Sequence, residues 1–173
     1  RRIVEKLVSK GAPLYGINTG FGDLAKVSIS PNDLVRLQEN LIRSHAVGVG
    51  NPLDEEIVRA SLLLRANTLA RGASGARPEL IDALLGLLNA NVVPVIPEKG
   101  SLGASGDLAP LAHMSLVLMG EGEAFYQGRR ITGALALKKA KLTPLSLEAK
   151  EGLALINGTP IMSAIACLTL VRA

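Results

Sequence analysis

The chain has 173 residues, of which 48% are hydrophobic, yet only two are Phe, two are Tyr and none is Trp. This length and composition predict one domain with a core of packed aliphatic helices and argue against an aromatic-rich β-sandwich. The net charge of +4 comes from 19 basic and 15 acidic residues that form no block, which argues against a nucleic acid partner.

The single cysteine, Cys167, excludes an internal disulfide and is typical of a reducing compartment. Because it stands in an apolar stretch, we expect its side chain to be a small buried hydrophobe. Neither a signal peptide nor an apolar run of bilayer length is evident, so the sequence predicts a cytoplasmic protein without a membrane partner.

Hydrophobic spacing and capping residues predict helices in the first half of the chain over residues 1–10, 30–44, 51–71 and 78–89. The second of these starts with Ser30 as its cap and Pro31 in its first turn, and we expect the third to begin in a similar way at Asn51-Pro52. Between the first two helices lies a loop with three glycines, residues 13–22, which lacks the spacing of a dinucleotide or phosphate loop.

The second half is predicted to hold a helix over residues 107–119, a β-hairpin over 123–131, and helices over 132–137, 146–156 and 161–173. Gln127-Gly128 is the expected hairpin turn, and Thr132 and Ser146 are the expected caps of the two helices that follow. The last helix is apolar on more than one face and lacks a polar cap, so we expect the natural chain to continue past it. The predicted fold class is therefore mainly α, with residues 1–173 as one N-terminal domain.

The stretch from Gly100 to Pro110, Gly-Ser-Leu-Gly-Ala-Ser-Gly-Asp-Leu-Ala-Pro, combines three glycines with the start of a helix. Its glycines permit backbone angles that other residues resist, which predicts a tight loop. Asp107 is a good N-cap, and Pro110 is tolerated in the first turn of the helix that follows. The loop is therefore expected to lie at the positive end of a helix dipole.

The triplet Ala104-Ser105-Gly106 inside this loop can undergo an unusual reaction. If the chain bends sharply, the Gly106 nitrogen can attack the Ala104 carbonyl carbon and close a five-membered ring with loss of water. Loss of the Ser105 hydroxyl then leaves a methylene group conjugated to the ring, which is an electrophile. The same triplet recurs at residues 73–75, where it is typical of a plain turn between helices, so the bare triplet has little specificity.

The chain holds two histidines, His45 and His113. His113 is flanked by apolar residues, which is typical of a structural histidine, whereas His45 lies at a helix end where structural and binding roles are equally open. With no cysteine or carboxylate at ligand spacing, the sequence predicts no metal site. It also shows no evident Ser-His-Asp grouping and no informative pair of carboxylates.

The whole run from Gly100 to Pro110 resembles the cofactor loop of the aromatic amino acid ammonia-lyase family, whose Ala-Ser-Gly becomes a methylidene-imidazolone. Three further motifs resemble that family in the same order. They are Tyr15 in Tyr-Gly-Ile-Asn-Thr-Gly-Phe-Gly, Ser44-His45 followed by two glycines, and Asn157 in Asn-Gly-Thr. Asp107 matches the acid beside the family's cofactor triplet.

This resemblance implies a catalytic role for Tyr15, for the triplet of residues 104–106 and for Asp107. It also implies that His45 hydrogen-bonds an imidazole side chain and that Asn157 orients the substrate or the cofactor. The cofactor would form autocatalytically, with no metal or nucleotide. Ser-His is the pattern of histidine-specific members, so the implied reaction is the non-oxidative deamination of L-histidine to trans-urocanate and ammonia.

The resemblance leaves two alternatives open. The nearest is a tyrosine or phenylalanine ammonia-lyase or a related aminomutase, and one from a different class is a helical assembly domain with no activity of its own. Members of the family are homotetramers with a long C-terminal helical bundle, which residues 1–173 lack. We therefore expect this stretch to be inactive in isolation.

Overall fold

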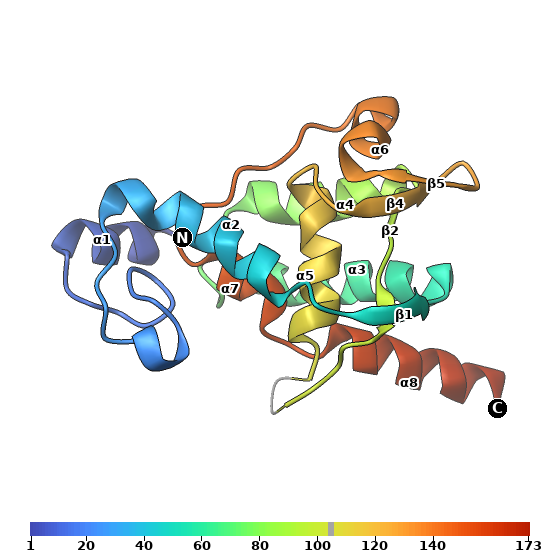
Figure 1. The fold of residues 1–173 in the computed structure, drawn as a ribbon, viewed down its shortest axis with the longest axis horizontal. Coiled ribbons are helices and arrows are strands. Elements are labelled where there is room, and N and C mark those ends of the chain that lie inside the picture. Colours follow the sequence, from blue (N-terminus) through green and yellow to red (C-terminus); the bar gives the residue numbers. More distant parts are fainter. Residues whose placement is uncertain (104–105) are drawn as a thin grey trace.

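The computed structural model describes residues 1–103 and 106–173, with Leu24 described by its backbone alone, so the predictions for Ala104 and Ser105 lie outside the described residues. The helices are α1 (Arg2–Lys10), α2 (Leu34–His45), α3 (Glu55–Ala70), α4 (Pro78–Asn89), α5 (Leu108–Leu118), α6 (Gly133–Ala140), α7 (Glu151–Ile156) and α8 (Pro160–Arg172) (Figure 1). The strands are β1 (Val49–Pro52), β2 (Val93–Pro94), β3 (Pro97–Lys99), β4 (Glu123–Tyr126) and β5 (Arg129–Thr132). The predicted mainly α fold with a small hairpin is thus confirmed.

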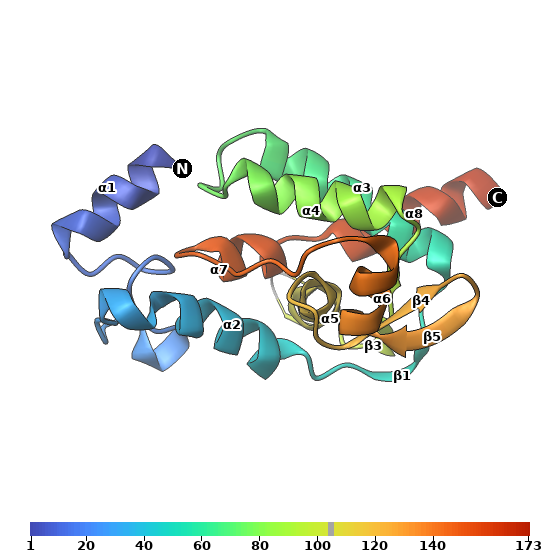
Figure 2. The ribbon, with the colours of Figure 1, turned by 90° about the horizontal axis from the view of Figure 1, so that it is seen from above.

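Helix α5 is the central element of the fold, and Figure 2 shows it end-on with α2, α6 and α7 around it. It is apolar on all sides, as expected of a helix that is covered by neighbours on every face. Leu111, Met114 and Val117 are fully buried, and they belong to one continuous core with aliphatic side chains of the surrounding helices. Residues 100–107, hereafter the glycine-rich loop, directly precede α5, so the core fixes the exit of that loop.

The predicted hairpin is formed by β4 and β5, with Tyr126 opposite Arg129. Its two turn residues, Gln127 and Gly128, have φ values of 51° and 72°, as a two-residue turn of type I′ requires. Strand β2 extends this sheet by pairing antiparallel with β4, and β1 pairs antiparallel with β3. The sequence did not predict β1, β2 or β3, because segments of two to four residues that contain proline show no alternating pattern.

Two predicted helix starts are wrong. Residues 49–52 form β1, and α3 begins only at Glu55, because the residue before a proline favours extended backbone and Pro52 pairs with Pro97. Ser146 caps no helix, since α7 begins at Glu151 after a left-handed residue. Ser30 precedes a short 3-10 helix, Pro31–Asp33, that leads into α2, but its side chain makes no capping bond, so the predicted cap at Ser30 is wrong. The predicted cap at Thr132 is confirmed, since Thr132 accepts a hydrogen bond from the backbone N–H of Leu135 in α6.

Cys167 is exposed, which corrects the expectation that it is buried. The reason is that α8 packs on α3 along one face, which leaves Leu170 79% and Val171 84% exposed. The expectation that no apolar run approaches bilayer length also needs correction. By length and composition alone, the 22 residues Glu151–Arg172 could cross a bilayer, a test that core helices of soluble proteins also pass.

Candidate active site

Backbone hydrogen bonds join Gly106 to Leu102 and Gly103, which precede the predicted cofactor triplet. Gly106 N–H donates to the Gly103 carbonyl over 3.2 Å, and Leu102 N–H donates to the Gly106 carbonyl over 2.7 Å. Gly103 and Gly106 both have φ of +79°, a value that disfavours residues with a Cβ. The described residues on the two sides of Ala104 and Ser105 are therefore held close together.

Asp107 stands at the N-cap position of α5 as predicted, but its side chain caps a different helix. Its Oδ2 accepts hydrogen bonds from the backbone N–H groups of Ile161 (2.9 Å) and Met162 (3.0 Å), in the first turn of α8. It makes no capping bond to α5. The carboxylate is fully buried, and the starts of α5 and α8 lie side by side (Figure 1). Asp107 thus ties the exit of the glycine-rich loop to α8.

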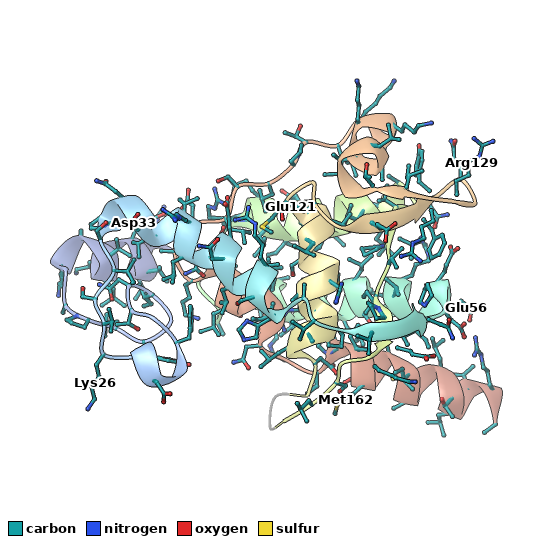
Figure 3. The ribbon with its side chains drawn as sticks, viewed as in Figure 1. Lys26, Asp33, Glu56, Glu121, Arg129 and Met162 are labelled. Carbon is teal, nitrogen blue, oxygen red and sulfur yellow. The ribbon has the colours of Figure 1, made fainter. Side chains whose placement is uncertain are left out.

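The surroundings of Gly106 are also closely packed. The hydroxyl of Ser101 lies within hydrogen-bonding distance of both the Gly106 carbonyl (3.0 Å) and Asp107 Oδ1 (3.2 Å). A Cβ on Gly106 would lie 2.7 Å from the sulfur of Met162, which Figure 3 shows at the start of α8. Only glycine fits at this position without a shift. The close approach and the folded backbone both fit a methylidene-imidazolone made from this triplet.

His45 is the last residue of α2, and its ring is oriented by the helix end. Its Nδ1 lies 2.8 Å from the Leu41 carbonyl, which can only accept, so Nδ1 carries the hydrogen and Nε2 is the acceptor. Ser44 Oγ lies 3.1 Å from the same Nδ1. The half-buried ring lines a hollow of about 310 Å³ together with apolar side chains that include Phe21 and Leu37. This arrangement can accept an N–H from a ligand.

The end of α2 is joined to the glycine-rich loop through His113. Its Nε2 accepts a hydrogen bond from the Gly48 N–H over 3.0 Å, and the Cα of Gly48 would lie 3.3 Å from a Cβ on Gly100. His113 thus has the structural contact that its apolar flanks predict. Burial lowers the pKa of the His113 imidazole below its usual range, because desolvation disfavours the charged ring.

We expect His113 to make the protein less stable as the pH falls from about 7 to 5. A lowered folded pKa means that the unfolded chain binds a proton near pH 6.5 while the folded chain does not, so acid favours unfolding. Thermal unfolding followed across this range should give a smaller acid-induced fall for His113→Gln than for the unsubstituted protein. Parallel curves for the two proteins would contradict this role.

Tyr15 lies in the loop that follows α1. Its ring packs edge-to-face on Phe21 with 5.9 Å between centroids, and its side chain is 59% exposed. Buried Asn18 holds this loop in shape, because Oδ1 accepts from Leu14 N–H and Nδ2 donates to the Ala12 carbonyl. Among the described residues, no hydrogen bond joins Tyr15 to Asp107. The catalytic role of Tyr15 stays a prediction.

Asn157 lies in the short turn between α7 and α8 and is exposed. Its backbone carbonyl accepts a hydrogen bond from Nη2 of Arg65, 3.0 Å away on α3. The turn leads directly into the α8 residues that Asp107 holds, and Thr159 lies 3.8 Å from the position of a Cβ on Gly106. The structure therefore brings the Asn157 turn beside the glycine-rich loop, a proximity that the sequence did not predict.

Sequence reasoning missed Arg65, Ser101 and Met162. Arg65 could have been noticed, because it falls on the buried face of α3 at helical spacing from Val58, Leu62 and Leu69, where a charged residue is unusual. Ser101 and Met162 carry no such signal, since their contacts depend on how distant segments meet. The part of the chain that the structure describes contains no group of three or more His, Cys, Asp or Glu residues that could hold a metal ion.

Comparisons with known proteins agree with the four sequence motifs. A family model described as aromatic amino acid lyase matches residues 1–173. The histidine ammonia-lyase of Caldanaerobacter subterraneus subsp. tengcongensis is 59% identical over 168 residues, which are 97% of this chain and 33% of that protein.

Solved structures of proteins with similar sequences share the fold. The crystal structure of histidine ammonia-lyase from Trypanosoma cruzi matches with a TM-score of 0.89 at 42% identity, covering 99% of this chain and 32% of that one. Phenylalanine aminomutase of Pantoea agglomerans matches with a TM-score of 0.90 at 40% identity, covering 97% of this chain and 32% of that one. The chain spans about a third of the length of the curated relatives that it matches. By the match of its whole length to the family model, the chain belongs to the aromatic amino acid lyase family.

Proposed function

We propose that residues 1–173 are the N-terminal domain of a carbon–nitrogen lyase that converts L-histidine to trans-urocanate and ammonia. The observation that carries this proposal is the folded glycine-rich loop, whose ends meet between Gly103 and Gly106 and whose exit Asp107 ties to α8. Curated relatives named histidine ammonia-lyase, 59% identical in the example above, support histidine as the substrate.

The cofactor in this proposal is a methylidene-imidazolone made from Ala104, Ser105 and Gly106, and it supplies an electrophile that ordinary side chains lack. Backbone folding at Gly103 and Gly106 supports its formation. Helix α5 begins directly after Asp107, so its first N–H groups are available to stabilise negative charge that develops beside the loop. Neither a metal nor a nucleotide is needed.

The chain's own residues have three roles in the proposed reaction. Tyr15 acts as the base and takes the proton from the β-carbon, and the electron pair of that C–H bond becomes the carbon–carbon double bond. The substrate's ammonium nitrogen leaves with the electron pair of the C–N bond as ammonia. His45 accepts an N–H of the substrate imidazole at Nε2, and Asn157 orients the substrate. Because Tyr15 is 59% exposed, we expect other parts of the full-length protein to enclose it.

We further propose that the full-length protein is a cytoplasmic homotetramer and that its C-terminal part supplies the long helical bundle of the family. The relatives are about three times as long as this chain, which supports a missing bundle. Residues 1–173 alone are then inactive, since the site lacks the groups that enclose Tyr15. Turnover of histidine by this isolated stretch would contradict that expectation.

The function is tested by adding L-histidine to the full-length protein and recording the ultraviolet absorbance of urocanate. L-tyrosine and L-phenylalanine are assayed in parallel, and products are separated by chromatography to detect β-amino acids. The aminomutase match at 40% identity makes that control necessary. A preference for tyrosine or phenylalanine would reassign the substrate, and no turnover of any aromatic amino acid would leave the alternative of a non-catalytic assembly domain.

A further inference from the structure

Arg65 is a buried cation with no acidic partner among the described residues. Its side chain points from α3 into the core and is only 3% exposed. In residues 1–103 and 106–173, no carboxylate lies within ion-pair distance of it, and its Nε has no hydrogen-bond partner. Desolvation lowers the pKa of Arg65 to about 10. A buried charge in such surroundings costs stability, so packing alone does not account for an arginine here.

Within the part of the chain that the structure describes, Arg65 donates hydrogen bonds to one end of α7. Its Nη2 donates to the backbone carbonyls of Ala154 and Asn157, which lie where the last carbonyls of the helix lack partners within it. A cation is also favoured there by the negative end of the helix dipole. The guanidinium approaches so closely that a Cβ on Gly158 would collide with Nη1. Arg65 is therefore a C-terminal cap supplied by a different helix.

The other end of α7 is held in the same way. Gln38 of α2 is fully buried, and its Oε1 accepts from Gly152 N–H over 2.9 Å and from Leu153 N–H over 3.4 Å. A helix of six residues has little stability by itself. Side chains from α2 and α3 consequently hold both ends of α7, together with Arg77 before α4, which pairs with Glu151 at the start of α7.

Asn157 lies between two such ties. Arg65 holds its carbonyl from α3, and three residues later α8 begins with the N–H groups that Asp107 holds. We propose that Arg65 is a positioning residue for catalysis, which aligns the Asn157 turn with the glycine-rich loop through its bonds to Ala154 and Asn157. This inference rests on the proposed lyase function and extends it to a residue that does not touch the substrate.

The test uses the full-length protein with Arg65→Lys and Arg65→Met. Methionine is similar in volume but removes both carbonyl bonds, while lysine keeps the charge on a single donor nitrogen in place of the planar guanidinium. The matched control is Arg59→Met, because Arg59 is on the same helix and donates to the Leu88 carbonyl over 3.1 Å, at the end of α4. Gly158→Ala is a further variant, which displaces the guanidinium without altering Arg65.

Four quantities are measured for each protein: the thermal midpoint, the mass change of the cofactor loop, kcat for histidine and KM for histidine. We expect Arg65→Met to lower kcat about 100-fold and Arg65→Lys about tenfold, because small misplacements of a reacting group cause losses of this size. In both variants the cofactor should still form, and KM should change less than kcat. Gly158→Ala is expected to lower kcat in the same direction. Arg59→Met is expected to keep kcat within about twofold.

A purely structural role predicts a different pattern. The thermal midpoint would then fall while kcat per cofactor-bearing molecule stayed within about twofold of the unsubstituted protein in Arg65→Lys, and this would overturn the proposal. An equal loss of kcat in Arg59→Met would overturn it as well. If the unsubstituted protein deaminates no aromatic amino acid, the proposed function fails first, so the two failures are distinguishable.

Discussion

Replacing Ser105 with alanine is expected to lower histidine turnover by the full-length protein about 1,000-fold or more, the scale on which enzymes lose activity when a covalent catalytic group is removed. The serine hydroxyl is the group whose loss would create the methylene. Without it the loop can lose one water by ring closure but not the second. Intact-mass measurement is therefore expected to show two waters lost from the unsubstituted protein and one at most from Ser105→Ala.

The chain contains its own control for this experiment. Ala73-Ser74-Gly75 has the same three residues between α3 and α4, and Gly75 has φ of +71°, close to the +79° of Gly106. It is followed by Ala76 rather than by an aspartate that is tied to another helix. Ser74→Ala is expected to keep full activity and the loss of two waters. Equal effects of the two substitutions, or full activity in Ser105→Ala, would refute the assignment of the cofactor.

Replacing Asp107 with alanine is expected both to destabilise the protein and to hinder cofactor formation in the loop. Its carboxylate accepts the N–H groups of Ile161 and Met162, and the buried N–H of Ile161 would be left without a partner. Loss of such a cap costs about 2 kcal/mol. Because the exit of the loop would no longer be tied to α8, we also expect cofactor formation to be incomplete and kcat to fall about 100-fold.

Asp33→Ala is the matched control for Asp107. Asp33 stands at the N-cap position of α2 and, like Asp107, makes no capping bond to its own helix. It is exposed, and its Oδ2 accepts from the Ser30 hydroxyl. Figure 3 shows it in a different part of the molecule from Met162. We expect little change in thermal midpoint, cofactor mass or kcat. A loss in Asp33→Ala as large as in Asp107→Ala would mean that the tie to α8 has no special role.

Local patterns in the sequence determined much of the fold. The apolar α5, the Gln127-Gly128 turn and the cap at Thr132 were all predictable, because helix periodicity, a left-handed turn and a side-chain cap each depend on residues within a few positions of one another. The four motifs likewise indicated the family that the comparisons identified. Features that arise within one stretch of chain can be read from that stretch.

Only the tertiary structure decided which helices these side chains bond to. Asp107 is an N-cap by sequence, yet its carboxylate binds α8, more than fifty positions further along the chain. Ser146 does not cap α7; instead Gln38 and Arg77 bond residues at its start, and Arg65 bonds carbonyls at its end. A buried polar group bonds to whichever unpaired backbone atoms the fold brings within about 3 Å, and no sequence pattern records that distance. The sequence thus predicted a chemistry for the glycine-rich loop, and only the tertiary structure showed that the bonds from Asp107 to α8 hold the exit of that loop in place.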